Sequence, residues 1–131
     1  MKRIVYTPNA PKAVGPYSQA VITENFVYTS GQVALTPEGN LLRVASIADE
    51  VHQVMKNLAA ILQAGGVDFD AVVRTTIYVT DVSLYSEVNK AYGVYMKEPY
   101  PARETVGVKE LPLGARVEIS MIAEAPMRKS S

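Results

Sequence analysis

The stretch that decides the fold is residues 46–79, SIADEVHQVMKNLAAILQAGGVDFDAVVRTTIYV, where a helical pattern passes into a strand pattern. Ser46, with Asp49 three residues later, resembles an N-terminal capping box in which aspartate replaces the usual glutamate. A stripe of apolar side chains follows at helical spacing: Ile47, Val51, Val54, Leu58, Ile61 and Leu62. Gly65-Gly66 is typical of a helix C-terminus, and the β-branched residues of 71–79 predict a strand.

Further strands and one more helix are predicted on either side of this unit. Before it, three strands are predicted over residues 2–6, 17–22 and 26–34. After it come a helix from about Ser83 to Met96 and two strands, over residues 101–108 and 116–123. Both helices are amphipathic on one stripe only, so the order β-β-β-α-β-α-β-β predicts an α+β fold with both helices packed on one face of a single sheet. A length of 131 residues predicts one domain, residues 1–131.

Strand 71–79 carries apolar side chains on both of its faces. Alternation would place Val73, Ile77 and Val79 on one face, with Val72 and Tyr78 on the other. A monomer would then expose apolar sheet surface, and we expect the protein to form an oligomer.

The last third of the chain, residues 101–123, predicts a β-hairpin closed by a Pro/Gly turn. If Thr105 lies across from Glu118, then Arg103 lies near Ser120 on the same sheet face. An arginine, a hydroxyl and a carboxylate would meet there, enough to hold a small carboxylate and manage a water molecule. A solvated ion pair is the competing interpretation, and spacing alone favours it.

Composition excludes several classes of protein. Thirteen basic residues balance thirteen acidic ones, which does not fit a duplex-binding protein, and Arg128-Lys129 is expected to be a solvated tail. The chain has no cysteine, which excludes disulfides, thiolate metal sites and a cysteine nucleophile. His52 is the only histidine and would lack partners as a metal ligand or in a catalytic triad. No run approaches ~18 apolar residues and no apolar signal core follows the N-terminus, so a cytoplasmic location is expected.

Three local features remain as candidates. Tyr17 follows the rigid Gly15-Pro16 turn, Gly31 lies inside a predicted strand where glycine marks a bulge or a close ligand approach, and Arg103 and Glu118 are the pair described above. Each feature also has a purely structural explanation: Tyr17 could be a packing residue, and Gly31 could mark a simple bulge.

Taken together and in order, the motifs of this chain resemble those of the reactive intermediate deaminase family (RidA or YjgF-like, endoribonuclease L-PSP-type). The resemblance covers nearly the whole chain, and the motifs that carry it are Asn9-Ala10-Pro11, Gly15-Pro16-Tyr17-Ser18-Gln19, Thr29-Ser30-Gly31-Gln32, Val54-Met55-Lys56-Asn57-Leu58, Val73-Arg74-Thr75-Thr76, Val88-Asn89, Pro101-Ala102-Arg103, Leu111-Pro112 and Val117-Glu118-Ile119.

The resemblance implies a chorismate-mutase-like fold and a homotrimer with a cleft at each subunit interface. It also implies hydrolysis of 2-imino and 2-enamino acids, such as 2-iminobutanoate and 2-iminopropanoate, to 2-keto acids and ammonia without a metal or organic cofactor. The family's functional positions fall here on Tyr17, Ser30, Gly31, Asn89, Arg103, Thr105 and Glu118. The chain departs from the family where many members carry a cysteine, at Thr105, and Glu104 and Gly107 replace the usual serine and glutamate.

The chemistry assigns these positions distinct expected roles. Arg103 would bind the substrate carboxylate with its planar fork, and Glu118 would deprotonate the water and return the proton to the leaving ammonia. The Thr105 backbone would help to hold the substrate, while Tyr17, Ser30, Gly31 and Asn89 line or shape the pocket. Two alternatives stay open: an RNA-cleaving or translation-inhibiting protein, and a ligand-binding regulator without turnover.

Overall fold

The computed structural model describes residues 2–42 and 46–126, and the predicted tail at Arg128-Lys129 lies outside them. Its elements follow the predicted order: β1 (Arg3–Val5), β2 (Ala20–Ile22), β3 (Phe26–Thr29), α1 (Ile47–Ala64), β4 (Val72–Val79), α2 (Tyr85–Gly93), β5 (Ala102–Gly107) and β6 (Val117–Glu124). Three short 3-10 turns lie at Phe69–Ala71, Val82–Leu84 and Pro112–Gly114.

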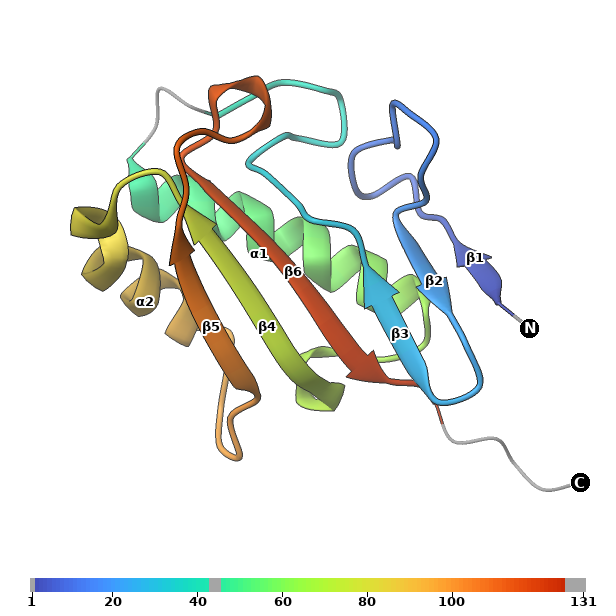
Figure 1. The fold of residues 1–131 in the computed structure, drawn as a ribbon. Helices are drawn as coiled ribbons and strands as arrows, with labels where there is room; N and C mark the ends of the chain where they lie inside the picture. The colour runs from blue at the N-terminus through green and yellow to red at the C-terminus, as the bar shows by residue number, and fades with distance from the viewer. Residues whose placement is uncertain (1, 43–45, 127–131) are drawn as a thin grey trace, which may run out of the picture.

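The strands form one mixed six-stranded sheet in the order β1-β2-β3-β6-β4-β5. All neighbours are antiparallel except β4 and β5, which run parallel and are joined through α2. Figure 1 shows α1 and α2 on the same side of the sheet, and the other side is left open. The α+β prediction, with both helices on one face, is confirmed.

Helix α1 begins and ends where its sequence signals lie. The Ser46 hydroxyl accepts a hydrogen bond from the Asp49 N–H at 3.2 Å, which satisfies one of the N–H groups that a helix start leaves unpaired. At the other end, Gly66 adopts φ +86°, a left-handed conformation that favours glycine. The predicted apolar stripe is buried along its whole length.

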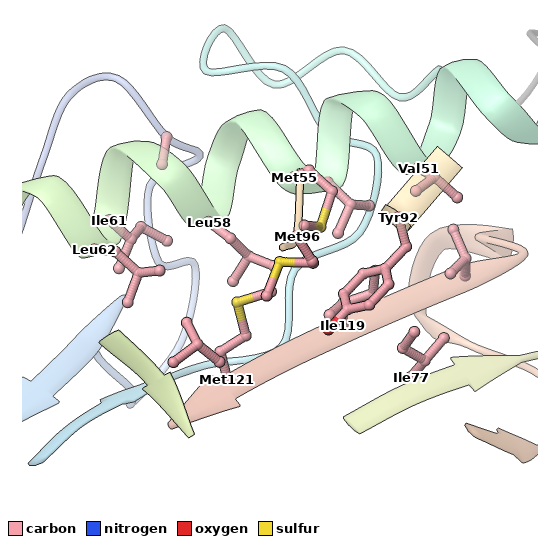
Figure 2. Close-up of a cluster of buried hydrophobic side chains, with 14 of the residues drawn as sticks. Val51, Met55, Leu58, Ile61, Leu62, Ile77, Tyr92, Met96, Ile119 and Met121 are labelled. Carbon is pink, nitrogen blue, oxygen red and sulfur yellow. The ribbon is translucent and has the colours of Figure 1, made fainter. Parts of the chain in front are cut away.

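The core lies between α1 and the helix-facing side of the sheet (Figure 2), and α2 closes one end of it. Figure 2 shows apolar side chains of α1 meeting side chains of β4, β6 and the α2 region; those labelled are Val51, Met55, Leu58, Ile61, Leu62, Ile77, Tyr92, Met96, Ile119 and Met121. Truncating one such side chain to alanine typically costs about 2–5 kcal/mol of folding stability. This packing fixes the sheet against the helices and so fixes the strands that carry the candidate residues.

The predicted hairpin between the last two strands is wrong. Strand β4 lies between β5 and β6 and pairs with both, so the last two strands do not touch through their backbones. The physical reason is the β4-α2-β5 unit, because a helix that packs back on the sheet returns the chain parallel to the strand before it. The 108–116 connection then crosses the end of β4 instead of making a tight turn.

The face assignment of strand β4 also needs a correction. A bulge shifts the register between Val72 and Arg74, so Val72 is buried on the helix side with Ile77 and Val79, while Val73 is exposed. A bulge inserts one residue and moves every side chain before it to the opposite face. Strict alternation from the sequence could not show it.

Candidate active site

Arg103 lies on the edge strand β5 and points toward helix α2. Its Nη1 donates to Asn89 Oδ1 at 2.8 Å, and its Nη2 donates to the Tyr85 hydroxyl at 2.9 Å. The guanidinium carbon also lies 5.7 Å from the ring centroid of Tyr85 and 5.2 Å from that of Tyr92, within the range of a cation–π interaction. Four contacts with one helix therefore hold this side chain in a fixed orientation.

The charge of Arg103 has no partner of opposite sign among the described residues. The ion pairs found there are Arg74–Glu104, Lys97–Asp70 and Arg116–Glu50. Both hydrogen-bond acceptors of Arg103 are neutral, and a guanidinium has five N–H donors, so about three remain available. Such a group suits the binding of an external carboxylate, which accepts two parallel N–H bonds.

Thr105 lies on the same strand face as Arg103, and its backbone N–H and C=O groups point to the free edge of the sheet. The Val108 N–H donates to the Val79 carbonyl at 2.8 Å, and in a parallel ladder the main-chain groups of successive residues point to opposite sides. This alternation directs the N–H and C=O of Arg103 and Thr105 toward the free edge of β5. The backbone role expected for Thr105 is therefore geometrically available.

Arg103 and Asn89 line a cleft of about 390 Å³ beside α2, with Tyr92, Gly93, Met96, Tyr100 and Pro101. Burial raises the pKa of the Tyr92 phenol, opposed by its hydrogen bond to Thr75 and by the Arg103 charge. Tyr92 is thus a neutral wall of this cleft, and its hydroxyl donates to Thr75 Oγ1 at 3.0 Å.

Glu118 lies on strand β6 in a second cleft, of about 530 Å³, on the open side of the sheet. The cleft is also lined by the predicted residues Tyr17, Ser30 and Gly31, and further by Pro11, Lys12, Val14, Gln19, Gln32, Val33, Leu35, Pro112 and Leu113. Burial raises the pKa of the Glu118 carboxyl, because desolvation penalises the charged form. Within the described part of the chain, no hydrogen-bond donor to this carboxylate is found, which leaves it available to a water molecule.

Gly31 makes room for the Glu118 side chain. A Cβ at position 31 would lie 2.6 Å from Glu118 Oε2 and 2.8 Å from its Cδ, so any larger residue would displace the carboxylate. The backbone is irregular there: Tyr28 pairs with Ile122 and Gln32 with Ile119, which leaves one extra residue on the Gly31 side. A bulge is therefore found beside this glycine, but β3 ends at Thr29, so Gly31 lies outside the strand predicted to hold it, and the group that approaches it is a side chain of the same protein.

Ser30 and Tyr17 shape the same cleft without a charged partner. The Ser30 hydroxyl donates to the Ser18 carbonyl at 2.5 Å, so its oxygen can still accept a hydrogen bond while its proton is engaged. The Tyr17 hydroxyl accepts from the Val14 N–H at 3.4 Å, and its ring is half exposed. Both residues fit a pocket wall better than a nucleophile.

Buried polar side chains hold the loops around this cleft. The Gln19 amide bridges the loop before β2, accepting from the Thr7 N–H at 2.7 Å and donating to the Pro11 carbonyl at 2.9 Å. Asn57 of α1 donates to the Leu35 carbonyl at 2.8 Å. Glu50, which is fully buried, accepts from Arg116 Nε at 2.5 Å just before β6. These contacts give the irregular segments a fixed backbone.

The structure places the two charged candidates on opposite faces of the sheet. Arg103 pairs across strands with buried Thr75 on the helix side, whereas Glu118 pairs with Tyr78 on the open side. They are two strands and three residue levels apart, ~10 Å in each direction. The predicted meeting of Arg103 with Glu118 on one face is therefore wrong for a single chain. Each candidate keeps its own cleft.

Two residues that contact Arg103, Tyr85 and Tyr92, were not predicted from the sequence as part of the site. With Asn89 they occupy positions i, i+4 and i+7 of one helix face, a spacing that could have flagged them. Across residues 2–42 and 46–126, no group of three or more His, Asp or Glu side chains gathers that could hold a metal ion. No helix in the described ranges has the length and apolarity to cross a bilayer.

The chain is similar to known proteins along nearly its whole length. A family model described as endoribonuclease L-PSP matches residues 7–125. The human 2-iminobutanoate/2-iminopropanoate deaminase is 39% identical over 132 residues, covering 100% of this chain and 96% of that protein.

Two solved structures share the fold closely. RidA from the Antarctic bacterium Psychrobacter sp. PAMC 21119 superposes with a TM-score of 0.89 at 39% identity, covering 93% of this chain and 98% of the other. Escherichia coli TdcF with bound serine gives a TM-score of 0.88 at 32% identity, covering 95% and 99%.

Proposed function

Because the chain belongs to the endoribonuclease L-PSP family, also called the YjgF or RidA family, we propose that it hydrolyses small 2-imino acids, such as 2-iminobutanoate and 2-iminopropanoate, to 2-keto acids and ammonia. Relatives that carry the name deaminase support an imine deaminase activity. The observation that carries the proposal is the pair of unpartnered charges, Arg103 in one cleft and Glu118 in the other.

In this proposal Arg103 binds the substrate carboxylate. Its remaining N–H groups form two parallel hydrogen bonds, and Asn89 and Tyr85 keep the guanidinium plane from rotating. The outward N–H of Thr105 adds a donor from the strand edge. Holding the carboxylate orients the neighbouring C=N carbon, which is where catalysis by positioning takes effect. Escherichia coli TdcF with bound serine supports a site that accepts a small amino acid-like carboxylate.

Glu118 performs the proton transfers. It takes a proton from water as the water oxygen adds to the carbon of the protonated imine, which gives a carbinolamine. It then returns that proton to the nitrogen, the C–N bond breaks, and the hydroxyl proton passes through Glu118 to the departing ammonia as the keto group forms. The sum is one water consumed and one ammonium released. Burial raises the pKa of the Glu118 carboxyl, so this carboxylate binds a proton more strongly than an exposed one does and can accept and return it.

Arg103 and Glu118 can act on the same substrate only if they come from neighbouring copies of the chain. We therefore propose a homotrimer in which β5 and α2 of one copy face the Glu118 cleft of the next, the number of copies following the family resemblance. The open sheet face supports association because it carries apolar side chains without cover, Ile4, Val21, Tyr28, Tyr78, Val106 and Ile122. Light scattering should give about three times the 14.2 kDa chain mass.

The decisive assay measures ammonia and 2-ketobutyrate released from freshly generated 2-iminobutanoate, with the spontaneous rate subtracted. Release above that rate, proportional to protein concentration, supports the proposal. A rate equal to the spontaneous rate would reject turnover and leave a ligand-binding regulator. The assay in metal-free buffer with a chelator also tests the expected cofactor independence. Cell fractionation tests the expected cytoplasmic location.

The family description names an endoribonuclease, so RNA cleavage is the second candidate. The single histidine, His52, bonds through Nδ1 to the Tyr95 hydroxyl at 2.8 Å, and acidic and basic residues balance. Neither feature favours RNA. Binding to labelled RNA at rising salt separates the two functions, since a phosphate-contacting protein should lose affinity steeply.

A further inference from the structure

Tyr85 stands at the first position of helix α2, one turn before Asn89, and its hydroxyl reaches the guanidinium of Arg103. In that hydrogen bond the phenol oxygen accepts from Nη2 at 2.9 Å. A phenol can both accept and donate, and its own proton has no acceptor within the described part of the chain. The side chain is about half exposed, so that proton faces accessible space beside an unpaired positive charge.

We propose that Tyr85 is a further substrate-binding residue, which holds Arg103 through its lone pair and donates its O–H to the carboxylate that Arg103 binds. The proposal rests on the carboxylate site of the proposed function and adds a donor that the family resemblance did not indicate. Accepting from a cation polarises the phenol, and a polarised O–H is a stronger donor. A carboxylate has about four acceptor positions, so two N–H bonds from Arg103 leave room for the phenol.

Comparison of Tyr85 with Tyr92 shows that the hydroxyl, and not the ring, is what distinguishes Tyr85. Both rings lie over the same guanidinium, at 5.7 Å for Tyr85 and 5.2 Å for Tyr92. The Tyr92 hydroxyl, however, turns away and donates to Thr75 in the core. Of these two hydroxyls, that of Tyr85 is the one available to a ligand, and phenylalanine could supply the ring without it.

The test compares Tyr85→Phe with wild type by calorimetry, using 2-ketobutyrate as the unreactive ligand. The variant keeps the ring and removes one hydrogen bond to a charged group, so its Kd should rise ~10- to 100-fold. In the imine assay KM should rise in step while kcat stays within about twofold, because the carboxylate is bound equally in ground and transition states. Tyr95→Phe is the matched control: it deletes a tyrosine hydroxyl bonded to His52, away from Arg103, and should leave Kd unchanged.

A second measurement distinguishes donation to the ligand from simple orientation of Arg103. Placing 3-fluorotyrosine at position 85 makes the phenol a stronger donor and a weaker acceptor. Tighter binding of 2-ketobutyrate than in wild type supports direct donation, and weaker or equal binding overturns it. An unchanged Kd in Tyr85→Phe also overturns it. If wild type binds 2-ketobutyrate but does not hydrolyse the imine, the proposed function fails while the Tyr85 assignment is still decided by these Kd values.

Discussion

Arg103 and Glu118 carry opposite charges, and the surroundings of the two side chains differ as strongly. Arg103 is clamped by two hydrogen bonds and two aromatic rings from a single helix. Glu118 meets no donor in the described structure, burial raises the pKa of its carboxyl, and a glycine lies directly against it. In the proposed mechanism, the residue that orients the substrate is held by its neighbours, whereas the residue that moves protons is desolvated and meets no hydrogen-bond donor in the described structure.

Arg103→Ala should give the largest effect of any single change. It removes charge-assisted hydrogen bonds worth ~1.5–3 kcal/mol each together with substrate orientation, so kcat/KM should fall roughly 10,000-fold or more and 2-ketobutyrate binding should be lost. Arg103→Lys should rescue poorly, since an ammonium cannot reproduce the planar fork. Calorimetry and the imine assay measure both. Undiminished ligand binding by Arg103→Ala would remove Arg103 from the site.

Glu118→Gln should lower the reaction rate without abolishing ligand binding, which distinguishes the role of Glu118 from that of Arg103. It keeps shape and removes the base, so the rate should fall ~100- to 10,000-fold while 2-ketobutyrate still binds. The acidic limb of the wild-type pH profile should lie above the usual carboxyl pKa, because burial raises the pKa of Glu118, and the variant should lack that limb.

The same substitution tests the electrostatics through stability. A carboxyl whose pKa is raised on folding stabilises the protein at low pH, and this stabilisation is lost as pH rises through the folded pKa. Glu118→Gln should therefore melt above wild type at neutral pH, with the difference vanishing in acid. Thermal melts at pH 4 and pH 7 measure this. Equal differences at both pH values would contradict a desolvated Glu118.

Gly31→Ala should lower the reaction rate by displacing the Glu118 carboxylate, and it should leave ligand binding by Arg103 unchanged. The added Cβ would lie 2.6 Å from Glu118 Oε2, and the flexible carboxylate should yield at little cost in stability. A displacement of about 1 Å can cost ~100-fold in rate, with 2-ketobutyrate binding retained. In the Glu118→Gln background the same change should cost far less, since both act on one group. Additive losses would separate Gly31 from Glu118.

Oligomers that mix the two variants should show the smallest loss of activity relative to wild type. They test most directly whether Arg103 and Glu118 of one site come from different copies of the chain. Arg103→Ala and Glu118→Gln chains should each lose ~100-fold or more in rate, but co-assembled copies can combine an intact Arg103 with an intact Glu118. With random assembly about one site in four is restored in a symmetric ring, so activity should return to about a quarter of wild type. Each variant assayed alone is the control. No recovery in verified mixed trimers would mean that both groups act within one chain.

Much of the fold could be predicted from the sequence, because it rests on local signals. The capping hydroxyl of Ser46, the left-handed Gly66 and the apolar stripe of α1 act within a few residues of one another, and each is found where the pattern indicates. The order of strands and helices follows from such signals as well. Tyr17, Ser30, Gly31 and Glu118 line one cleft, while Asn89 and Arg103, which the family resemblance groups with them, line the other.

What the sequence could not determine depends on pairings between distant strands. Periodicity says which residues share a face of one strand, but it does not say which strand lies beside it. The insertion of β4 between β5 and β6, with one bulge, sends Arg103 and Glu118 to opposite faces.

By itself, then, the sequence determined the helices, the strands and the kinds of chemical groups that the protein carries, because these depend on neighbours along the chain. Only the tertiary structure decided that the Arg103 guanidinium is held by Tyr85 and Asn89, and that it lies across the sheet from the carboxylate expected to work with it. The physical reason is that strand order and register are set by burying the two helices on one sheet face, a choice made by the whole core and not by any local segment.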